Sequence, residues 1–234
     1  MPDLVLRVSS VRRTTPAACT IRLDLDGTPF HYRAGQVAAL GPAGTSHQVP
    51  YSIASAPEET AARGSLEFLV KTDSAGRWGN HFEALHRGSL LTVRGPAGAF
   101  TFPDTPRERY FLFIAGGTGI APLRSMIRHV VLSRRPGHIR LHYSARTPHD
   151  FAYLPELRGM ARRGEIGLSL TATREMTPRW RGARGRIVAA QLTPLVEDPA
   201  TLCFVCGPTS MVADVPLILQ GLGIDRSRIL VEDY

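Results

Sequence analysis

The stretch FLFIAGGTGIAPLRSM, from Phe111 to Met126, decides the fold of this chain. An apolar run leads into a glycine turn, and apolar residues at spacings of three and four then predict a helix. Glycine admits backbone angles closed to other residues, and its missing Cβ lets a pyrophosphate approach the main chain. Unpaired N–H groups at the start of the helix would face that anion. The stretch therefore predicts a dinucleotide phosphate site and nicotinamide-dependent redox chemistry.

The glycine turn differs from the usual dinucleotide fingerprint. From Gly117 it reads Gly-x-Gly-x-x-Pro, with Pro122 in the place of the third glycine. An acidic residue is also missing from the ribose-binding position, about 20 residues further on. Ordinary tight turns produce similar patterns, so other segments of the chain are needed to show whether this turn binds a dinucleotide.

Length, charge and composition exclude several classes of protein. The 234 residues allow one large domain or two smaller ones, and the formal charge is +8. The basic residues are scattered, Lys71 is the only lysine, and no aromatic-basic interleaving accompanies them, so we expect no nucleic-acid partner. The apolar runs are shorter than the ~20 residues of a membrane span, and the N-terminus lacks a secretory layout. We therefore expect a cytoplasmic protein with no membrane partner.

Three cysteines are present, Cys19, Cys203 and Cys206. The last two form a C-x-x-C, which is compatible with a redox pair or half a metal site. They lie, however, within the apolar run TLCFVCGP, where side chains three apart point to opposite faces of a strand. Three cysteines also cannot supply the four thiolates of a plant-type iron-sulfur cluster. We interpret the pair as structural and expect no metal.

The two halves of the chain differ in the secondary structure that their sequence patterns predict. Up to about residue 102 the sequence predicts short strands, which are LVLRVSSV, CTIRLDLDGTPFHY with a hairpin at Asp26-Gly27, QVAAL, PYSIAS, LEFLVKT and LLTVRG. One helix-like piece, residues 79–86, interrupts them. This half resembles an antiparallel barrel or sandwich.

The second half alternates apolar strands with helical patterns. The strands are YFLFIA, IRLHYSA, LSLTATR, LCFVCG and RILVEDY, and the helices lie near residues 119–133, 153–163 and 208–221. Such alternation favours a parallel sheet covered on both faces. The proline-marked stretch TFPDTPRER is the natural linker, and we therefore place domain boundaries at 1–103 and 104–234.

The stretch PYSIAS, residues 50–55, carries a second chemical signature. Alternation along a strand places Tyr51 and Ile53 on one face and Ser52 on the other, so a ring and a hydroxyl could bracket a flat ligand. An ordinary strand with polar residues facing water is the alternative. The glycine-flanked stretch AGRWGNHF, residues 75–82, could hold a second phosphate group at a helix start and favours the first interpretation.

The ordered set PYSIAS, GRWGN, GPAGAF, GGTGIAP, CGPTSM and a C-terminal aromatic residue resembles the ferredoxin-NADP reductase superfamily over essentially the whole chain. The resemblance implies an antiparallel six-stranded flavin-binding barrel, followed by a Rossmann-like five-stranded parallel α/β domain that binds NAD(P)H. It also implies an FAD-dependent NAD(P)H reductase of the reductase-component type without an iron-sulfur domain.

The same resemblance assigns roles by position. Tyr51 and Ile53 would lie in the flavin motif, and Ser52 would hydrogen-bond flavin N5. The flavin pyrophosphate would be held by Gly76, Arg77, Trp78, Gly79 and Asn80. Gly117, Thr118, Gly119 and Pro122 would form the nicotinamide nucleotide turn, while Cys206, Gly207, Pro208 and Met211 would border the nicotinamide ring. We expect Ser52, Cys206, Glu232 and Tyr234 to be the catalytic residues.

The last residues and two arginines complete the expected site. In this family a near-terminal aromatic ring covers the flavin face, and Tyr234 stands in that place, although it could instead cap the last strand. Thr173-Arg174-Glu175 is similar to the family's grip on a 2′-phosphate, with Arg146 as a second contact. The planar fork of arginine suits that dianion, so we favour NADPH over NADH, with solvated loop arginines as the alternative.

Two positions depart from the family. An arginine that pairs with flavin phosphate usually stands two residues before the tyrosine, and this chain has Val49. Losing such a contact costs about 1.5 to 3 kcal/mol, or about one to two decades of affinity. Gly79 replaces a residue that often carries a hydroxyl. His47, Arg77 or backbone N–H groups could compensate, or flavin could behave as a diffusible substrate.

The sequence thus predicts a monomeric enzyme that passes hydride from NAD(P)H to FAD and then electrons singly to a separate protein acceptor, such as a ferredoxin or an oxygenase. Two alternatives remain. One is an NAD(P)H-dependent free-flavin reductase. The other is a flavin-free regulatory or interaction module of the same fold, which only Val49 supports.

Overall fold

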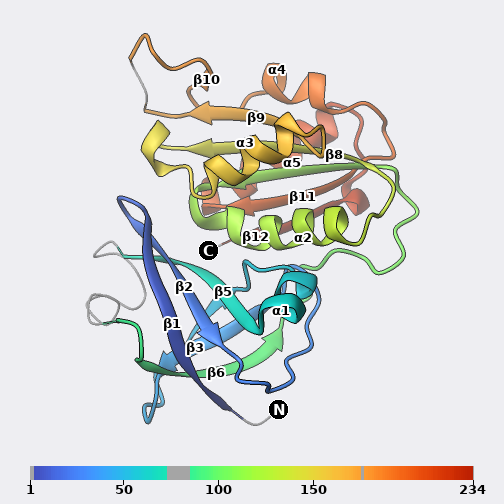
Figure 1. Ribbon diagram of the computed structural model, residues 1–234. Helices are drawn as coiled ribbons and strands as arrows, with labels where there is room; N and C mark the ends of the chain where they lie inside the picture. The colour runs from blue at the N-terminus through green and yellow to red at the C-terminus, as the bar shows by residue number, and fades with distance from the viewer. Residues whose placement is uncertain (1–2, 73–84, 175–176, 234) are drawn as a thin grey trace. The chain divides into compact units, whose positions relative to one another are not determined.

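The computed structural model describes residues 3–72, 85–174 and 177–233, which form two compact units (Figure 1). The first unit comprises Met1–Phe102 with Arg124–Ser133, and the second comprises Pro103–Leu123 with Arg134–Tyr234. Helix α2 (Ile120–Leu132) therefore contributes residues to both units. The expected helix over 79–86 lies outside the described residues as far as residue 84, and Leu85 and His86 are not helical.

The first unit contains a six-stranded antiparallel sheet, which confirms the predicted barrel. Its strands are β1 (Leu4–Thr15), β2 (Ala18–Asp24), β3 (Val37–Pro42), β4 (Val49–Ser52), β5 (Ser65–Lys71) and β6 (Leu90–Ala97). They follow the order β4-β3-β6-β1-β2-β5. A single bridge between Ile53 and Phe68 joins the two edge strands, so the sheet closes on itself.

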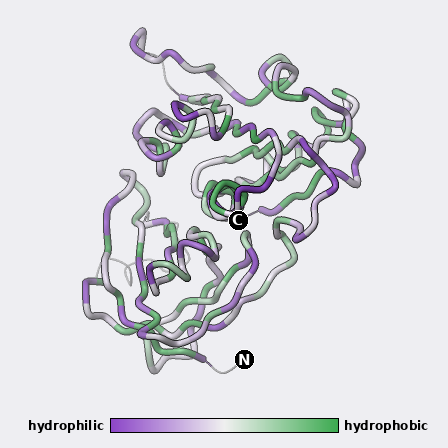
Figure 2. The backbone as a smooth tube through the Cα atoms, turned by 45° about the vertical axis from the view of Figure 1, so that its right-hand side comes forward, coloured by the Kyte–Doolittle hydropathy of each residue, from purple (hydrophilic) through white to green (hydrophobic). Residues whose placement is uncertain are grey.

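The barrel core follows from the period-two alternation of the strands. Leu6 and Val8 on β1 and Ile21 and Leu23 on β2 are all buried, and the residue between the members of each pair, Arg7 or Arg22, is exposed. Figure 2 shows short hydrophobic stretches separated by hydrophilic ones along the backbone. Removing these side chains from water is the main force that holds the unit together.

The hairpin expected at Asp26-Gly27 is wrong. Asp26 and Gly27 do have positive φ angles, 47° and 80°, and the Thr28 amide donates to the Leu25 carbonyl. Strand β2, however, ends at Asp24 and already pairs with β1 and β5, so both of its hydrogen-bonding edges are occupied. The following segment cannot add a strand there, and instead Tyr32 packs against the barrel core.

Helix α1 (Pro57–Arg63) was not anticipated, although its signals are present in the sequence PEETAARG. Proline stands at the first position, Glu58 and Glu59 occupy the first turn, and Arg63 lies in the last turn. Gly64 ends the helix in the left-handed conformation, with φ of 65°. Seven residues are too few for the periodicity that identifies longer helices.

The second unit contains a parallel sheet in the order β10-β9-β8-β7-β11-β12. The five expected strands are β7 (Tyr110–Gly116), β8 (His138–Ala145), β9 (Gly167–Ala172), β11 (Leu202–Gly207) and β12 (Ile229–Asp233). The expected count of five is one short, because Ala183–Arg184 pairs with β9 as a two-residue strand, β10. Two residues are too few to show a period, so β10 could not be predicted from sequence.

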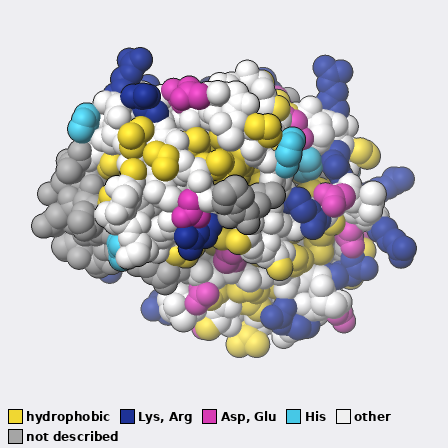
Figure 3. Space-filling view, turned by 90° about the horizontal axis from the view of Figure 1, so that it is seen from below, with side chains coloured by type: hydrophobic (Ala, Val, Ile, Leu, Met, Phe, Trp, Pro, Cys, Tyr) yellow, Lys and Arg dark blue, Asp and Glu magenta, His cyan; other side chains and the backbone are white. Residues whose placement is uncertain are grey.

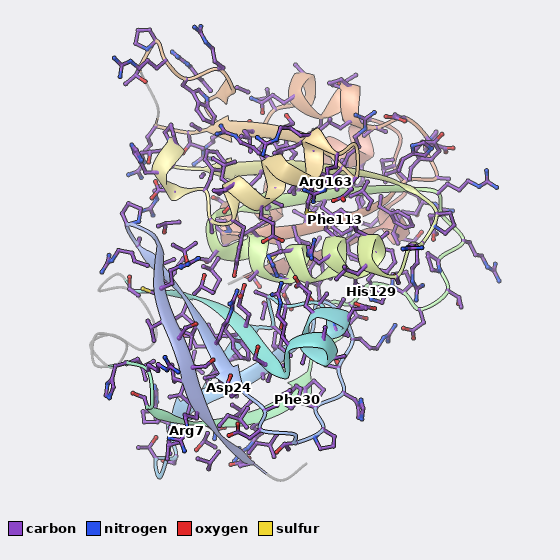
Figure 4. The ribbon with its side chains drawn as sticks, in the orientation of Figure 1. Arg7, Asp24, Phe30, Phe113, His129 and Arg163 are labelled. Carbon is purple, nitrogen blue, oxygen red and sulfur yellow. The ribbon has the colours of Figure 1, made fainter. Side chains whose placement is uncertain are left out.

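Helices cover both faces of this sheet, as expected (Figure 1). Figure 1 shows α3 (Leu154–Arg162) in front of the sheet and α5 (Thr209–Gly221) behind it. Helix α5 and the short α4 (Ala189–Leu192) pack on a face formed by Leu112, Ile114, Cys203 and Val205. The opposite face carries Phe113 and Phe204, whose rings stack with centroids 5.0 Å apart. Phe113 is labelled within the sheet in Figure 4.

The order of the strands creates a topological switch point between β7 and β11. In chain order the five main strands run 3-2-1-4-5, so the connections leave β7 in one direction and reach β11 in the other. All neighbouring pairs are parallel, which brings the carboxyl ends of the strands to one edge. Ligands of doubly wound sheets bind at this position.

The surface shows no concentration of one charge on the face in Figure 3, where arginine and lysine groups are separated by acidic side chains. Within residues 3–72, 85–174 and 177–233, no helix is both long and apolar enough to cross a membrane. Over the same ranges, no three histidine, cysteine or acidic side chains gather as metal ligands would.

His142 on β8 generates a stability prediction. It is fully buried between the hydroxyl groups of Ser169 and Thr171, at 3.2 and 3.1 Å, and burial lowers its pKa from 6.5 to about 4. The unfolded chain therefore protonates His142 near pH 6.5, whereas the folded chain does so only near pH 4. The free energy of unfolding consequently falls as the pH drops below 6.5. Between pH 7 and pH 5 this loss should be about 2 kcal/mol.

Urea unfolding of wild type and His142→Gln at both pH values tests this prediction. The variant should lose about 2 kcal/mol less than wild type over the interval, whatever its absolute stability. His138→Gln, at an exposed position on the same strand, is the control and should keep the wild-type slope. Equal pH slopes in wild type and His142→Gln would contradict the assignment.

Candidate functional site

Two backbone segments interlock at the carboxyl ends of β7 and β11. A Cβ atom on Gly119 would overlap the Cys206 carbonyl, so only glycine permits this approach. Gly116 is equally confined, since a Cβ there would lie 2.7 Å from Met211 Sδ and 2.8 Å from Pro208 Cδ. The structure thus brings together residues that the sequence assigned to one nucleotide site from segments about 90 positions apart.

Gly117 begins the turn with a φ of 54°, and a tyrosine holds it in place. Tyr143 on β8 is fully buried and donates its hydroxyl hydrogen to the Gly117 carbonyl at 2.9 Å. The Tyr143 hydroxyl oxygen also accepts a hydrogen bond from the Ala152 amide at 3.1 Å. Sequence reasoning missed Tyr143, because its position in YSART looked like an ordinary core residue and only the register of β7 and β8 reveals the contact.

The start of α2 suits an anion. Gly117–Gly119 forms a single 3-10 turn that leads directly into the 13-residue α2, and neither element has an acidic residue in its first turn. Thr118 is half-buried, whereas Pro122 is buried within the first turn of the helix. Free N–H groups and the positive end of the helix dipole thus face the turn without a competing carboxylate, which fits a dinucleotide phosphate.

Cys206 and Glu232 lie opposite each other in the register of β11 and β12. Burial, aided by Glu232 and Asp233, raises the pKa of the Cys206 thiol far above its ordinary value of 9.0, so it remains protonated at neutral pH. Burial and the neighbouring Asp233 also raise the pKa of Glu232 to about 7. Cys206 therefore contributes an uncharged thiol to the candidate site, and the Glu232 carboxyl titrates near physiological pH.

The expected 2′-phosphate residues lie at the same edge of the sheet. The Thr173 amide donates to the Ala145 carbonyl at 2.9 Å, and the Arg174 amide donates to the Arg146 carbonyl at 2.8 Å. This pairing places Arg146 and Arg174 side by side, and both are exposed. Two exposed arginines on neighbouring backbone segments offer guanidinium donors that suit a dianion.

An aromatic stack supports the arginine-rich segment that follows. The ring of Trp180 stacks on Phe151 with centroids 5.5 Å apart, and Phe151 meets Tyr143 edge-on at 5.0 Å. Trp180 also donates its indole hydrogen to the Ala183 carbonyl at 2.8 Å. Phe151 therefore lies between the tryptophan of the segment that contains β10 and the tyrosine that holds the glycine turn.

In the first unit, β4 carries the expected flavin motif. Tyr51 and Ser52 are half-buried, and Tyr51 packs against the barrel core. Ile53 is fully buried in that core, so its side chain is closed to a ligand. Val49 is 5% exposed and points into the same core, which is consistent with an apolar residue in place of the family's arginine. His47 is exposed nearby in sequence.

Some expected site residues lie outside the described part of the chain. These are Gly76, Arg77, Trp78, Gly79 and Asn80 of the flavin pyrophosphate motif, and Tyr234. Separately, a cavity of about 500 Å³ is lined by residues 104–109 and 135–138, at the amino ends of β7 and β8. It lies at the opposite edge of the sheet from the glycine turn and takes no part in the candidate site.

Comparison with known proteins agrees with this arrangement. The family model described as "Oxidoreductase FAD-binding domain" matches residues 6–102, and "Oxidoreductase NAD-binding domain" matches residues 113–216. Ferredoxin-NADP reductase B of Sorangium cellulosum is 33% identical, with 97% of this chain and 96% of the relative covered. The chain belongs to the ferredoxin-NADP reductase family. It is accordingly an FAD-dependent NAD(P)H oxidoreductase.

Two further similarities extend this result. The glycine betaine monooxygenase reductase subunit of Pseudomonas aeruginosa is 32% identical over 92% of this chain, which spans only 54% of that relative. The crystal structure of a ferredoxin NADP+ reductase from Neisseria gonorrhoeae with bound FAD and NADP has a TM-score of 0.82 at 21% identity, and it covers 100% of this chain and 99% of its own. The structural match establishes the shared fold.

The raised pKa of Glu232 predicts that nucleotide binding depends on pH. Below pH 7 the carboxyl is mostly protonated, and above pH 7 its negative charge opposes an anionic dinucleotide at the same edge. The affinity for NAD+ should fall about threefold between pH 6 and pH 8 in wild type and stay flat in Glu232→Gln. NAD+ is the right probe, because a 2′-phosphate titrates in the same range.

Titration of NAD+ binding at several pH values measures this effect. Asp214→Asn, which removes an exposed carboxylate of α5, is the control and should follow the wild-type profile. If the NAD+ affinity of Glu232→Gln still changed near pH 7, a group other than Glu232 would be responsible for the pH dependence.

Proposed function

We propose that this protein is the reductase component of an electron-transfer pair and passes electrons from NAD(P)H through FAD to a separate protein acceptor. The observation that carries the proposal is the interlocked edge of β7 and β11, where Gly116 and Gly119 meet Met211 and Cys206. Such a close backbone approach is the construction that admits a dinucleotide at a switch point. When bound, FAD takes two electrons as hydride and can release them singly.

The side chains of this chain then act mainly by positioning. The glycine turn and the first turn of α2 bind the nucleotide phosphate, and Tyr143 fixes the turn through the Gly117 carbonyl. Cys206 stays a neutral thiol, so it shapes the nicotinamide site without competing as a nucleophile. In the other unit, half-buried Tyr51 and Ser52 would orient the flavin, with the Ser52 hydroxyl as the hydrogen-bonding group.

The acceptor is proposed to be a ferredoxin, an oxygenase or a similar redox protein. Support comes from relatives that are named as reductase components, including the glycine betaine monooxygenase reductase subunit, which is longer than this chain. A cytoplasmic location and a monomeric state remain predictions from the sequence.

Val49 supports a second candidate, an NAD(P)H-dependent free-flavin reductase. Its side chain is buried in the barrel core and offers no charge to flavin phosphate. If no other group compensates, flavin would bind more weakly by about one to two decades and would exchange as a substrate.

The absorbance spectrum of the purified protein separates these candidates. A reductase component should carry yellow flavin that NADPH bleaches without added flavin, and it should then reduce a one-electron acceptor. A free-flavin reductase should purify colourless and show saturation in added FMN, FAD or riboflavin. A colourless preparation inert toward all three flavins would refute both proposals.

Arg174 and Arg146 support a preference for NADPH over NADH, because a backbone hydrogen bond joins these two exposed arginines at the carboxyl ends of the strands. Arg174→Ala should raise the KM for NADPH about tenfold or more, a loss of ~1.4 kcal/mol, and leave the KM for NADH nearly unchanged. Steady-state kinetics with both nucleotides provide the test. Arg179→Ala, at an exposed position in the same arginine-rich region, is the matched control. Equal effects of Arg174→Ala on the two nucleotides would remove the 2′-phosphate argument.

A further inference from the structure

Among the described residues, strand β4 has a ladder partner on one side, β3. Its residues Val49–Ser52 pair with β3, and beyond them a single bridge joins Ile53 to Phe68. The chain then turns into α1 at Pro57. Backbone bonds hold the amides at the end of the strand, since the Ile53 amide donates to the Gln36 carbonyl at 2.9 Å and the Ala54 amide donates to the Glu67 carbonyl at 2.7 Å. The Ala54 and Ser55 carbonyls of the following turn, in contrast, take their donors from side chains outside the sheet.

Two consecutive carbonyls of this turn receive buried hydrogen bonds from α2. Arg124 Nη1 donates to the Ala54 carbonyl at 2.7 Å, and Ser125 Oγ donates to the Ser55 carbonyl at 2.6 Å. Tyr32 adds a second donor to the Ser55 carbonyl at 2.8 Å. Arg124 is 4% exposed and Ser125 is fully buried, so water cannot replace either donor.

Glu59 on α1 holds the arginine in place. Its Oε2 atom accepts from Arg124 Nη1 and from the Ala56 amide, both at 3.0 Å, and its Oε1 atom accepts from Arg128 Nε at 3.1 Å. Burial opposes the ionisation of Glu59, but Arg124, the Ala56 amide and Arg128 outweigh it and keep its pKa below 4.5. The carboxylate therefore stays charged and fixes Arg124 against the turn.

The surrounding groups complete this network. Glu67 on β5 lies 3.9 Å from Arg124 and accepts from Arg22 Nε at 2.7 Å. His129, labelled on α2 in Figure 4, makes a 2.7 Å contact with Glu58 on α1. Every one of these residues belongs to the first unit, because Arg124–Ser133 is part of it. The network thus joins α2, α1 and β5 around residues 54–56.

We propose that Arg124, held by Glu59, is a positioning residue for the flavin-binding strand. It fixes the Ala54 carbonyl and thereby the direction in which Tyr51 and Ser52 present their side chains. The inference rests on the proposed function, in which β4 faces flavin. The network constrains β4 from the end that leads into the buried turn. Val49, at the other end of the strand, is an apolar core residue.

The test compares Arg124→Gln and Arg124→Lys with a matched control, Arg22→Gln. Arg22 belongs to the same network through Glu67, and its hydrogen bond there is 2.7 Å long, but its side chain is 45% exposed and donates to no atom of the turn. Flavin affinity is measured by fluorescence titration and ring orientation by the visible circular dichroism of bound flavin. Urea unfolding of the flavin-free proteins reports general stability.

Arg124→Gln should weaken flavin binding about tenfold and change the visible dichroism, whereas Arg22→Gln should keep affinity within about twofold and leave the dichroism unchanged. Arg124→Lys keeps the charge beside Glu59 but loses the planar fork that reaches two acceptors. It should therefore recover most of the stability and still show altered dichroism. If Arg124→Gln does not fold, the flavin affinity and dichroism of Arg124→Lys still test the proposal.

Two other outcomes would overturn the proposal and remain distinct from each other. Wild-type flavin affinity and dichroism in both Arg124 variants, with only stability reduced, would show that the network serves folding alone. If wild type itself binds no flavin, the proposed function fails first, and the positioning role falls with it.

Discussion

The close approach of two backbones at the carboxyl edge of the parallel sheet is the constraint on which the second unit depends. The turn after β7 and the segment after β11 come so near that a Cβ atom on Gly119 would overlap the Cys206 carbonyl, and one on Gly116 would lie within 2.8 Å of Met211 and Pro208. Any side chain at either glycine would separate the segments. The strand order makes the contact possible, because β7 and β11 are neighbours although about 90 residues lie between them. Tyr143 completes the arrangement by bonding the Gly117 carbonyl from the adjacent strand.

The first unit depends on a different interaction, a buried ionic network around the end of β4. Removing Arg124 and Glu59 from water is costly, and their mutual attraction offsets that cost only because further hydrogen bonds satisfy both groups. The Ala54 carbonyl, the Ala56 amide and Arg128 supply those bonds. Apolar residues could fill the same space, but they would leave the Ala54 carbonyl without the Arg124 donor. The network therefore gives the strand a defined direction, which burial alone does not provide.

Sequence reasoning succeeded where a pattern was long and failed where it was short. The helices near 119–133, 153–163 and 208–221 correspond to α2, α3 and α5, since each spans enough turns for its apolar spacing to be read. Strand β10 has two residues and α1 has seven, which is too few. The hairpin at Asp26-Gly27 had correct turn chemistry, and its failure shows that a turn cannot create a strand when both edges of β2 are occupied. In the sequence, Tyr143 resembles any core aromatic residue and Arg124 any helix arginine. No local pattern predicts their hydrogen bonds to the Gly117 and Ala54 carbonyls.

By itself, the sequence determined the two kinds of unit, the family, and the glycine and cysteine segments of the candidate nucleotide site. These properties are written in short-range patterns, because periodicity, turn residues and ordered motifs all act between neighbours in the chain. Only the tertiary structure decided that Cys206 is a protonated wall, that Glu232 titrates near neutral pH, and that Arg124 holds the turn after β4. Those properties depend on burial and on partners from distant segments, and no local pattern encodes the distance between two atoms that folding brings together.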